Sequence, residues 1–181
     1  VPTVGGFIVG LFARYGTKAI RGHGIPEAME QILTNQSRVS PRVLLLKPIA
    51  SAIAIGTGGP FGAEGPIIAT GGALGSYIGQ IISITPHERK TLLAAGAAAG
   101  MTAIFGTPVA AVLLAVELLL FELRASSLIP VALACASAAA IGRVMGNGHP
   151  IFSLAAGHTL GTASPSAMIF YAALGLLMGV I

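Results

Sequence analysis

Three apolar runs of this sequence are each interrupted by a short glycine–proline stretch and then followed by another apolar run. We refer to the interruptions as the first, second and third breaks: GHGIP (22–26), GAEGP (62–66) and GTP (106–108). Proline suits the first turn of a helix, because the N–H that it lacks has no intrahelical partner there. The pattern therefore predicts that a new helix begins at the proline of each break, at Pro26, Pro66 and Pro108.

The scarcity of charge places these runs in a lipid bilayer. Charged residues make up 9% and hydrophobic residues 54% of the 181 residues, whereas a soluble domain carries about 25% charged residues. We therefore expect an all-α, polytopic integral membrane protein, and a lipid bilayer as its surroundings. Irregular backbone at membrane depth is tolerated only where it is buried in protein or lines a wet cavity, so the breaks predict such a place.

Small residues predict how the helices pack. The chain has 25 glycines, and many of them gather with alanine in TGGALGS (70–76) and AAGAAAG (94–100). Lipid supplies no hydrophobic drive for helix association, so close backbone contact between small residues stabilises it instead. We expect both stretches to lie in helix–helix interfaces.

Basic residues predict the orientation of the chain. They cluster at 38–47, 89–90 and 124, and these clusters share one face if each broken pair of segments enters the membrane and returns. The positive-inside rule assigns that face to the cytoplasm, with TPHERK (85–90) as one of its polar loops. Because the chain begins with Val1 and ends in an apolar run, we interpret it as part of a longer protein.

Signals of other function classes are missing from the sequence. It has no Walker loop, zinc-finger spacing or Ser–His–Asp signature, and its net charge of +4 needs no nucleic acid to explain it. The histidines outside the first break have no ligand spacing, at His87, His149 and His158. We therefore expect no enzyme, no metal, no cofactor and no nucleic-acid partner.

The breaks indicate an anion site. A helix N-terminus carries about half a positive charge and several free N–H donors. Several such ends aimed at one point attract an anion weakly enough to release it, as in secondary transporters with broken helices. We expect residues 22–25, 62–65 and 105–107 to converge on one polar point that lacks any Lys or Arg side chain. Arg21 is expected to point toward the cytoplasmic mouth.

Glu64 is the one charged residue between Ile49 and Ile84. An ionised carboxylate tethered at such a helix end can occupy the place of a permeant anion, and a protonated one can swing away. Glu64 is therefore predicted to gate anions and to accept a proton, since intramembrane carboxylates are costly and usually functional. The alternative is that Glu64 is only an acidic residue in the first turn of a helix.

GHGIPE, GAEGP and GAAAGMTAIFGTPVAAVLLAVE together resemble three successive signature regions of the CLC family of voltage-gated chloride channels and proton/chloride exchangers. The resemblance covers nearly the whole chain. It implies a CLC-type fold of broken, tilted helices, with residues 1–181 as one transmembrane domain, the first of two inverted halves. It also implies an inorganic anion as transported ligand, a homodimer, a second half outside this chain, and a bacterial inner or plasma membrane location.

The resemblance also assigns residues. The family's gating glutamate falls on Glu64, and backbone amides of Ala63, Glu64 and Gly65 are implied to form the outer anion site. The loop that serves the central anion falls on five consecutive residues: Gly22, His23, Gly24, Ile25 and Pro26.

Three residues depart from the family pattern. The usual basic residue before the gating glutamate is Ala63 here. The usual serine of the first break is His23, which can donate an N–H to an anion or bond to local backbone. The internal glutamate of the exchangers is replaced by Leu118. Its neighbour Glu117 is expected to be a structural carboxylate bonded near a helix end, or a proton relay.

Several functions stay open at this point. The first is chloride transport through a pore gated by Glu64, and the second is a proton-coupled antiporter with altered coupling. A structural or dimerisation fragment would use small-residue faces at 94–100 and 127–142. An intramembrane enzyme would use Glu64 and His23 as acid and base, but the sequence offers no nucleophile or metal cluster for it. A cation transporter would use Glu64 and Glu117 as ligands, but it would need more carboxylates at its site.

Overall fold

A computed structural model describes residues 2–17, 20–22, 24–146 and 164–180. The chain divides into two compact units, Val1–Ile151 and Phe152–Ile181. In the described residues the secondary structure is helical throughout, as the all-α prediction requires. The first unit contains α1 (Pro2–Tyr15), α2 (Ile25–Thr34), α3 (Pro41–Gly56), α4 (Glu64–Ile81), α5 (Pro86–Phe105), α6 (Pro108–Ala115), the π-helical segment η2 (Val116–Leu120) and α7 (Ala125–Met145). The second unit contains α8 (Pro165–Val180).

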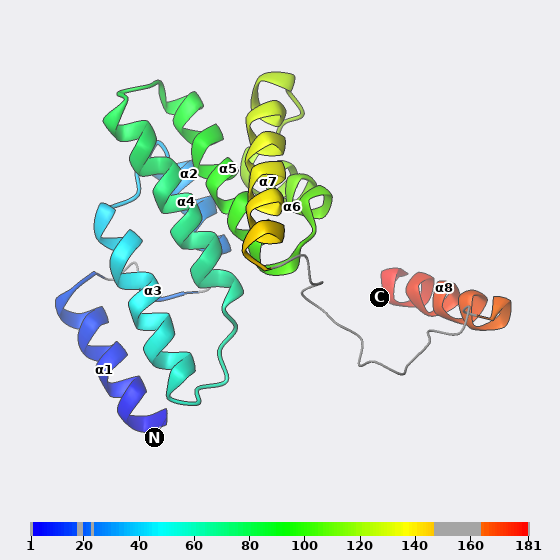
Figure 1. Ribbon diagram of the computed structural model, residues 1–181, viewed down its shortest axis with the longest axis horizontal. Helices are drawn as coiled ribbons and strands as arrows, with labels where there is room; N and C mark the ends of the chain where they lie inside the picture. The colour runs from blue at the N-terminus through cyan, green and yellow to red at the C-terminus, as the bar shows by residue number, and fades with distance from the viewer. Residues whose placement is uncertain (1, 18–19, 23, 147–163, 181) are drawn as a thin grey trace. The chain divides into compact units, whose positions relative to one another are not determined.

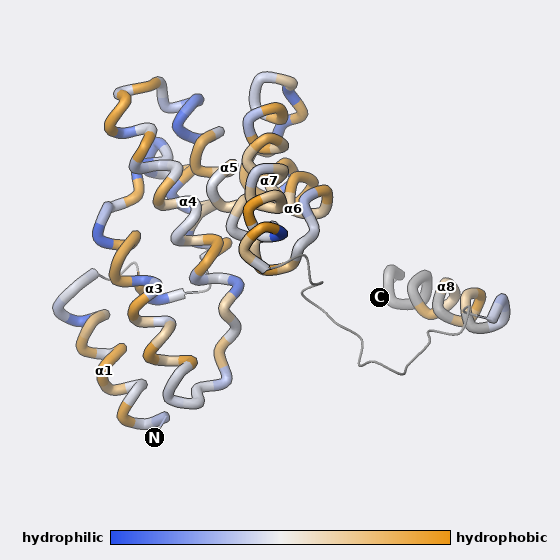
Figure 2. Tube along the Cα trace, in the orientation of Figure 1, coloured by the Kyte–Doolittle hydropathy of each residue, from blue (hydrophilic) through white to orange (hydrophobic). Residues whose placement is uncertain are grey.

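The helices of the first unit pack side by side around α4 and α5. Figure 1 shows α3 against α4, α1 against α3, and α7 on the other side of α5, and the contacts between these helices agree. Figure 2 shows apolar residues along most of the length of the helices, with hydrophilic residues gathered mainly near helix ends and in the turns. The buried core is made mainly of side chains from α5, α6, η2 and α7.

The interface between α4 and α5 is built from glycine. A β-carbon placed on Gly71 would lie 2.2 Å from the carbonyl oxygen of Gly96, and one on Gly96 would lie 2.1 Å from that of Gly71. A β-carbon on Gly75 would lie 2.0 Å from the carbonyl oxygen of Leu92. The predicted interface of the two small-residue stretches, 70–76 and 94–100, is therefore confirmed, and no larger residue fits without moving a backbone.

The three breaks separate helices as predicted. Pro26 is the second residue of α2 and Pro108 is the first residue of α6. α4 begins two residues before Pro66, so that Glu64 is itself the first helical residue. Between α5 and α6, Gly106 adopts a left-handed φ of 67°, which ends α5 before Pro108 starts the next helix.

One predicted loop is wrong. Residues 86–90 were expected to be loop, but they form the first turn of α5, which begins at Pro86. The hydroxyl of Thr85 accepts a hydrogen bond from the Glu88 backbone N–H at 3.3 Å, and the Glu88 carboxylate accepts one from the Thr85 N–H at 3.0 Å. This reciprocal capping box satisfies N–H groups that the helix start leaves free, so a charged stretch continues as helix.

α7 is long and apolar enough to cross a membrane, the one such helix among the described residues. The stretch Pro108–Leu120 is a shorter apolar helix. Large apolar side chains point outward from both, including Val109, Leu113 and Leu133. This surface suits contact with lipid or protein, not water.

Candidate functional site

The first and second breaks meet in space. Gly24, the residue before α2, is buried, and a β-carbon placed on it would lie 2.1 Å from the carbonyl oxygen of Gly65 and 3.1 Å from its α-carbon. Gly24 also has a φ of 102°, which side chains other than hydrogen rarely allow. Glycine at this position therefore lets the start of α2 touch the start of α4.

Glu27 fixes the first break from within α2. Its Oε2 accepts a hydrogen bond from the Gly24 backbone N–H at 2.6 Å. Gly22, at a φ of 97°, lies so close that an added β-carbon would overlap the same carboxylate. The carboxylate replaces the side-chain cap that a glycine cannot supply, so the loop has one preferred shape.

Lys47 reaches the same loop from α3. Its side chain is 2% exposed, and its Nζ donates hydrogen bonds to the carbonyl oxygens of Ile20 and Gly22, both at 2.9 Å. We expected no Lys or Arg side chain at the point where the breaks converge, and Lys47 contacts the first break on its carbonyl side. Lys47 was grouped with the basic cluster at 38–47, but it is the seventh residue of α3 and its side chain is buried, where loop carbonyls solvate its charge.

Glu64 is the first residue of α4 and directly precedes Gly65, which contacts Gly24. Its side chain is exposed, and it accepts no hydrogen bond and forms no ion pair with the described residues. Ala63, in the N-cap position, has no side-chain oxygen to cap the helix. An unpaired carboxylate thus stands at the positive end of an 18-residue helix, where an anion is stabilised.

A cavity opens beside the first break. It has a volume of about 450 Å³, and its lining runs from Gly24 and Lys47 past Arg21 to the polar turn after α2, with Asn35 and Arg38. Arg21 is exposed. Three basic residues, Arg21, Arg38 and Lys47, and two acidic residues, Glu27 and Glu30, line this cavity, which connects the first break with the polar turn after α2.

Glu117 lies on η2, a single π-helical turn. Its side chain is exposed and accepts no hydrogen bond from the described residues, so the bonded structural role that was expected has no partner here. The end of η2 is held instead by Lys90, whose Nζ donates to the Leu120 carbonyl and lies 5.9 Å from the centre of the Phe121 ring. Cations suit a helix C-terminus, because its free carbonyls carry negative partial charge.

The other predicted site residues fall around these contacts. Ile25 and Gly65 are partly buried, whereas Gly22, Pro26 and Ala63 are exposed. His23 lies outside the described residues. Convergence of the third break on the same point stays a prediction.

Sequence reasoning missed two residues that shape the site, Glu27 and Lys47. A signal for each was present. Glu27 follows directly after the first break in GHGIPE, and Lys47 is a cation within the apolar run VLLLKPIA. A charge placed in such a run needs a polar partner, which is the signal that Lys47 contacts another part of the chain.

Comparison with known proteins gives one family. The family model of the voltage-gated chloride channels matches residues 5–181. The chain is 30% identical to the voltage-gated ClC-type chloride channel ClcB of Yersinia pestis over 187 residues, which are 98% of this chain and 43% of the relative. Over 116 residues, or 63% of this chain and 24% of the relative, it is 37% identical to the H⁺/Cl⁻ exchange transporter ClcA of Vibrio cholerae.

A solved structure shares the fold. The X-ray crystal structure of a slow cyanobacterial Cl⁻/H⁺ antiporter matches with a TM-score of 0.79 at 25% identity, over 97% of this chain and 42% of that chain. This chain therefore spans less than half the length of each of these relatives. With the family model matched from residue 5 to residue 181, the chain belongs to the voltage-gated chloride channel (CLC) family of integral membrane proteins.

Proposed function

We propose that this chain forms the first half of a membrane pathway for chloride or a similar inorganic anion, and that Glu64 gates it. The observation that carries the proposal is the meeting of the first two breaks at Gly24 and Gly65, with the unpaired Glu64 carboxylate next to it. Two helix N-termini then start from one place, which is the arrangement that attracts an anion without a bound cation.

The charges near the breaks fit weak anion binding. Lys47 donates to carbonyl oxygens of residues 20 and 22, so its positive charge is partly balanced by these dipoles. Anion attraction then comes from backbone N–H groups, with the exposed Arg21 on the lining of the neighbouring cavity as an added positive charge. Such attraction concentrates anions and still lets them leave. The backbone N–H groups of Gly22, Ile25, Ala63, Glu64 and Gly65 are the donors that we assign to the anion, because the Gly24 N–H is bonded to Glu27.

Glu64 acts by competition in this proposal. Its ionised carboxylate occupies the anion position at the start of α4 and keeps the pathway closed. On protonation it loses its charge, gives up that position and opens the pathway, so one side chain links anion movement to pH. Because Glu64 is unpaired among the described residues, no ion pair has to break when it moves.

The experiment is Glu64→Gln in the full-length protein, reconstituted in liposomes. Glutamine keeps the shape of the side chain but neither competes as an anion nor carries a proton. We expect chloride flux to persist and to lose its pH dependence, with coupled proton movement abolished. Glu88→Gln is the matched control, because Glu88 is an exposed carboxylate away from the breaks, and glutamine can still accept the Thr85 hydrogen bonds. Full proton coupling in the Glu64 variant would rule out the gate.

Channel and exchanger modes differ in their use of Glu117. An exchanger would pass the proton on from Glu64, and Glu117 is an exposed carboxylate on a π-helical turn, a geometry often found at functional sites. Glu117→Gln is expected to remove proton movement and keep chloride flux if the protein is an exchanger. Absence of proton movement in the parent favours the passive channel, and unchanged proton movement in the variant rules out Glu117 as the relay.

The complete pathway needs partners that this chain lacks. We propose that the second half of the fold covers the exposed face around Glu64, and that two copies assemble in the bilayer. The outward-pointing apolar residues of α6 and α7, such as Val109 and Leu133, suit such an interface. If this chain serves only in assembly or dimerisation, the reconstituted full-length protein will pass none of chloride, fluoride, nitrate or sodium.

A further inference from the structure

A second cavity lies at the turn between α4 and α5, away from the breaks. Its volume is about 410 Å³, and it is polar. Six residues line it: Arg38, Gln80, Ser83, Ile84, Pro86 and Arg89. Two of the six are arginines and none is acidic, so the lining carries an uncompensated positive charge.

Arg89 is the residue that needs an explanation. Its side chain is 5% exposed. Nη2 donates a hydrogen bond to the Ile84 carbonyl oxygen at 3.0 Å, and Nη1 donates one to the Gln36 carbonyl oxygen at 3.3 Å. Its Nε is buried without a hydrogen-bond partner. A guanidinium carries five N–H donors, and a buried charge with donors left over is costly.

Neighbouring carboxylates do not balance this charge in the described part of the chain. Glu88 is next in sequence, but its Oε2 accepts hydrogen bonds from the backbone and hydroxyl of Thr85, at 3.0 and 2.7 Å. Glu122 faces His87 at 3.8 Å and Arg124 at 3.5 Å. The acidic residues of this end of the unit are thus committed elsewhere.

Two further donors line the same cavity. Arg38 is exposed, and its guanidinium forms no ion pair with the described residues. The Ser83 hydroxyl has no hydrogen-bond partner among them, and Ser83 sits at a left-handed φ of 56°. The Gln80 side-chain amide donates hydrogen bonds to the Val39 carbonyl oxygen and the Ser76 hydroxyl, both at 3.0 Å. Its N–H groups are therefore used within the protein and are not assigned to a ligand.

We propose that this cavity binds the phosphate group of an anionic phospholipid. A phosphate offers several charged acceptors at once, and the planar fork of arginine matches that geometry. Arg89 forms the floor of the site, while Arg38 and Ser83 contact the phosphate at its rim. The proposal does not rest on the anion pathway, although Arg38 also lines the cavity beside the first break.

Apolar residues beside the cavity select a lipid over free phosphate. Ile81 and Ile82, at the end of α4, are 64% and 63% exposed and directly precede Ser83. They provide a surface for acyl chains next to the phosphate position. The sequence assigns this turn to the cytoplasmic side, where anionic lipids attract basic residues.

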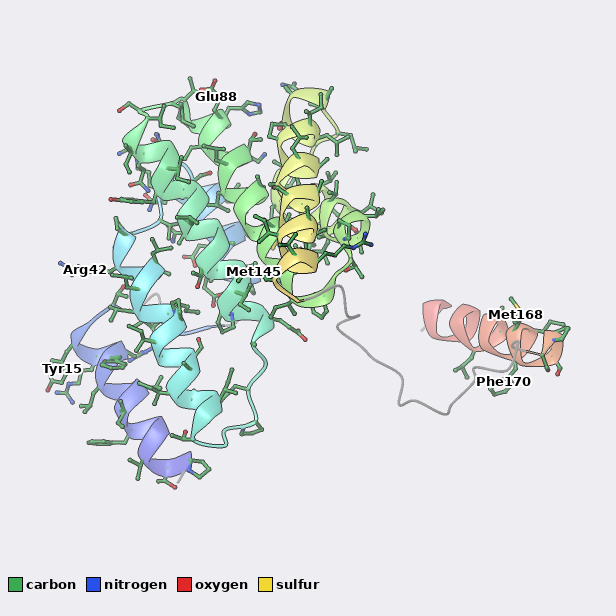
Figure 3. The ribbon with its side chains drawn as sticks, viewed as in Figure 1. Tyr15, Arg42, Glu88, Met145, Met168 and Phe170 are labelled. Carbon is green, nitrogen blue, oxygen red and sulfur yellow. The ribbon has the colours of Figure 1, made fainter. Side chains whose placement is uncertain are left out.

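The test uses the full-length protein in nanodiscs of phosphatidylcholine with a fraction of phosphatidic acid, with retained lipids counted by native mass spectrometry. The variants are Arg38→Gln and Ser83→Ala, since Arg89→Gln risks misfolding. Arg42→Gln is the matched control, because Arg42 is also exposed, carries the same charge and lines neither cavity. Figure 3 shows Arg42 at the start of α3, and Glu88 near the turn that bears the cavity.

We expect the parent to retain phosphatidic acid preferentially. One surface arginine contributes about fivefold to binding of an anionic membrane through its charge alone, so Arg42→Gln measures that nonspecific loss. Arg38→Gln is expected to lose about tenfold, and Ser83→Ala, which removes no charge, about threefold. A loss for Arg38→Gln no larger than that of the control, together with no loss for Ser83→Ala, overturns the proposal. A second arm adds inorganic phosphate: displacement of the lipid at micromolar phosphate overturns the lipid as ligand.

Discussion

Gly24→Ala tests whether contact between the first two breaks matters to transport. The methyl group would lie 2.1 Å from the Gly65 carbonyl oxygen, whereas a carbon and an oxygen in contact stay about 3.3 Å apart. The obstacle is backbone, so α2 and α4 have to separate by roughly 1 Å at their starts. The residue would also be held at a φ of 102°.

The cost of this change follows from both effects. A side chain in a disallowed φ region costs about 1–3 kcal/mol, and overpacking costs about 1–3 kcal/mol more. The two costs add to about 2–6 kcal/mol, a large fraction of the about 5–15 kcal/mol by which proteins are stable. We expect Gly24→Ala to lower the midpoint of thermal unfolding and to reduce chloride flux from liposomes strongly.

The assay needs a control variant, which shows that an effect comes from the contact between the breaks and not from the replacement of a glycine as such. Gly62→Ala serves, because Gly62 lies in the second break, is exposed, and has no atom within 4 Å of an added β-carbon. Flux and unfolding midpoint should match the parent in this control. If Gly24→Ala also transports and unfolds like the parent, the breaks do not meet as described, and the argument for an anion site at their junction fails.

Three further outcomes are expected. Gly96→Ala should destabilise the protein by about 1–3 kcal/mol in denaturant unfolding in detergent, because its β-carbon would lie 2.1 Å from the Gly71 carbonyl oxygen. The control is Gly142→Ala in α7, which has open space around it and should be neutral or slightly stabilising. Lys90→Met should lower stability by about 1 kcal/mol in the same measurement through loss of the bond to Leu120, with anion selectivity unchanged. Lys47→Met should lower the stability by about 2–4 kcal/mol and weaken chloride binding in calorimetry, whereas Lys47→Arg should recover part of both.

The parts of the fold that the sequence predicted correctly rest on local rules. Proline and glycine restrict the backbone wherever they occur, so the helix starts at Pro26 and Pro108 were visible without knowledge of the packing. Small residues at helical spacing likewise indicated the α4–α5 interface, since close backbone contact is their common use in membranes. The family resemblance added the assignment of Glu64.

The parts that the sequence missed depend on partners distant along the chain. Residues 86–90 look like a loop because they are polar, yet a reciprocal bond between Thr85 and Glu88 makes them helical. The meeting of Gly24 with Gly65 joins residues 41 positions apart, and hydropathy carries no signal for it. The orphaned donor on Arg89 is visible only once its carbonyl partners are known.

Lys47 limits the rule that an anion site formed by helix ends has no cationic side chain near it. The rule holds that a fixed ammonium binds an anion too tightly, and by count of residues Lys47 lies outside the breaks. Its Nζ nevertheless reaches the carbonyls of Ile20 and Gly22, and turns them toward itself. Peptide units turned this way direct carbonyl oxygens toward the lysine and leave N–H groups of the following residues for the other side of the loop. The buried cation thus holds the loop through its carbonyl groups, and the bond from the Gly24 N–H to Glu27 holds the end of the loop next to α2.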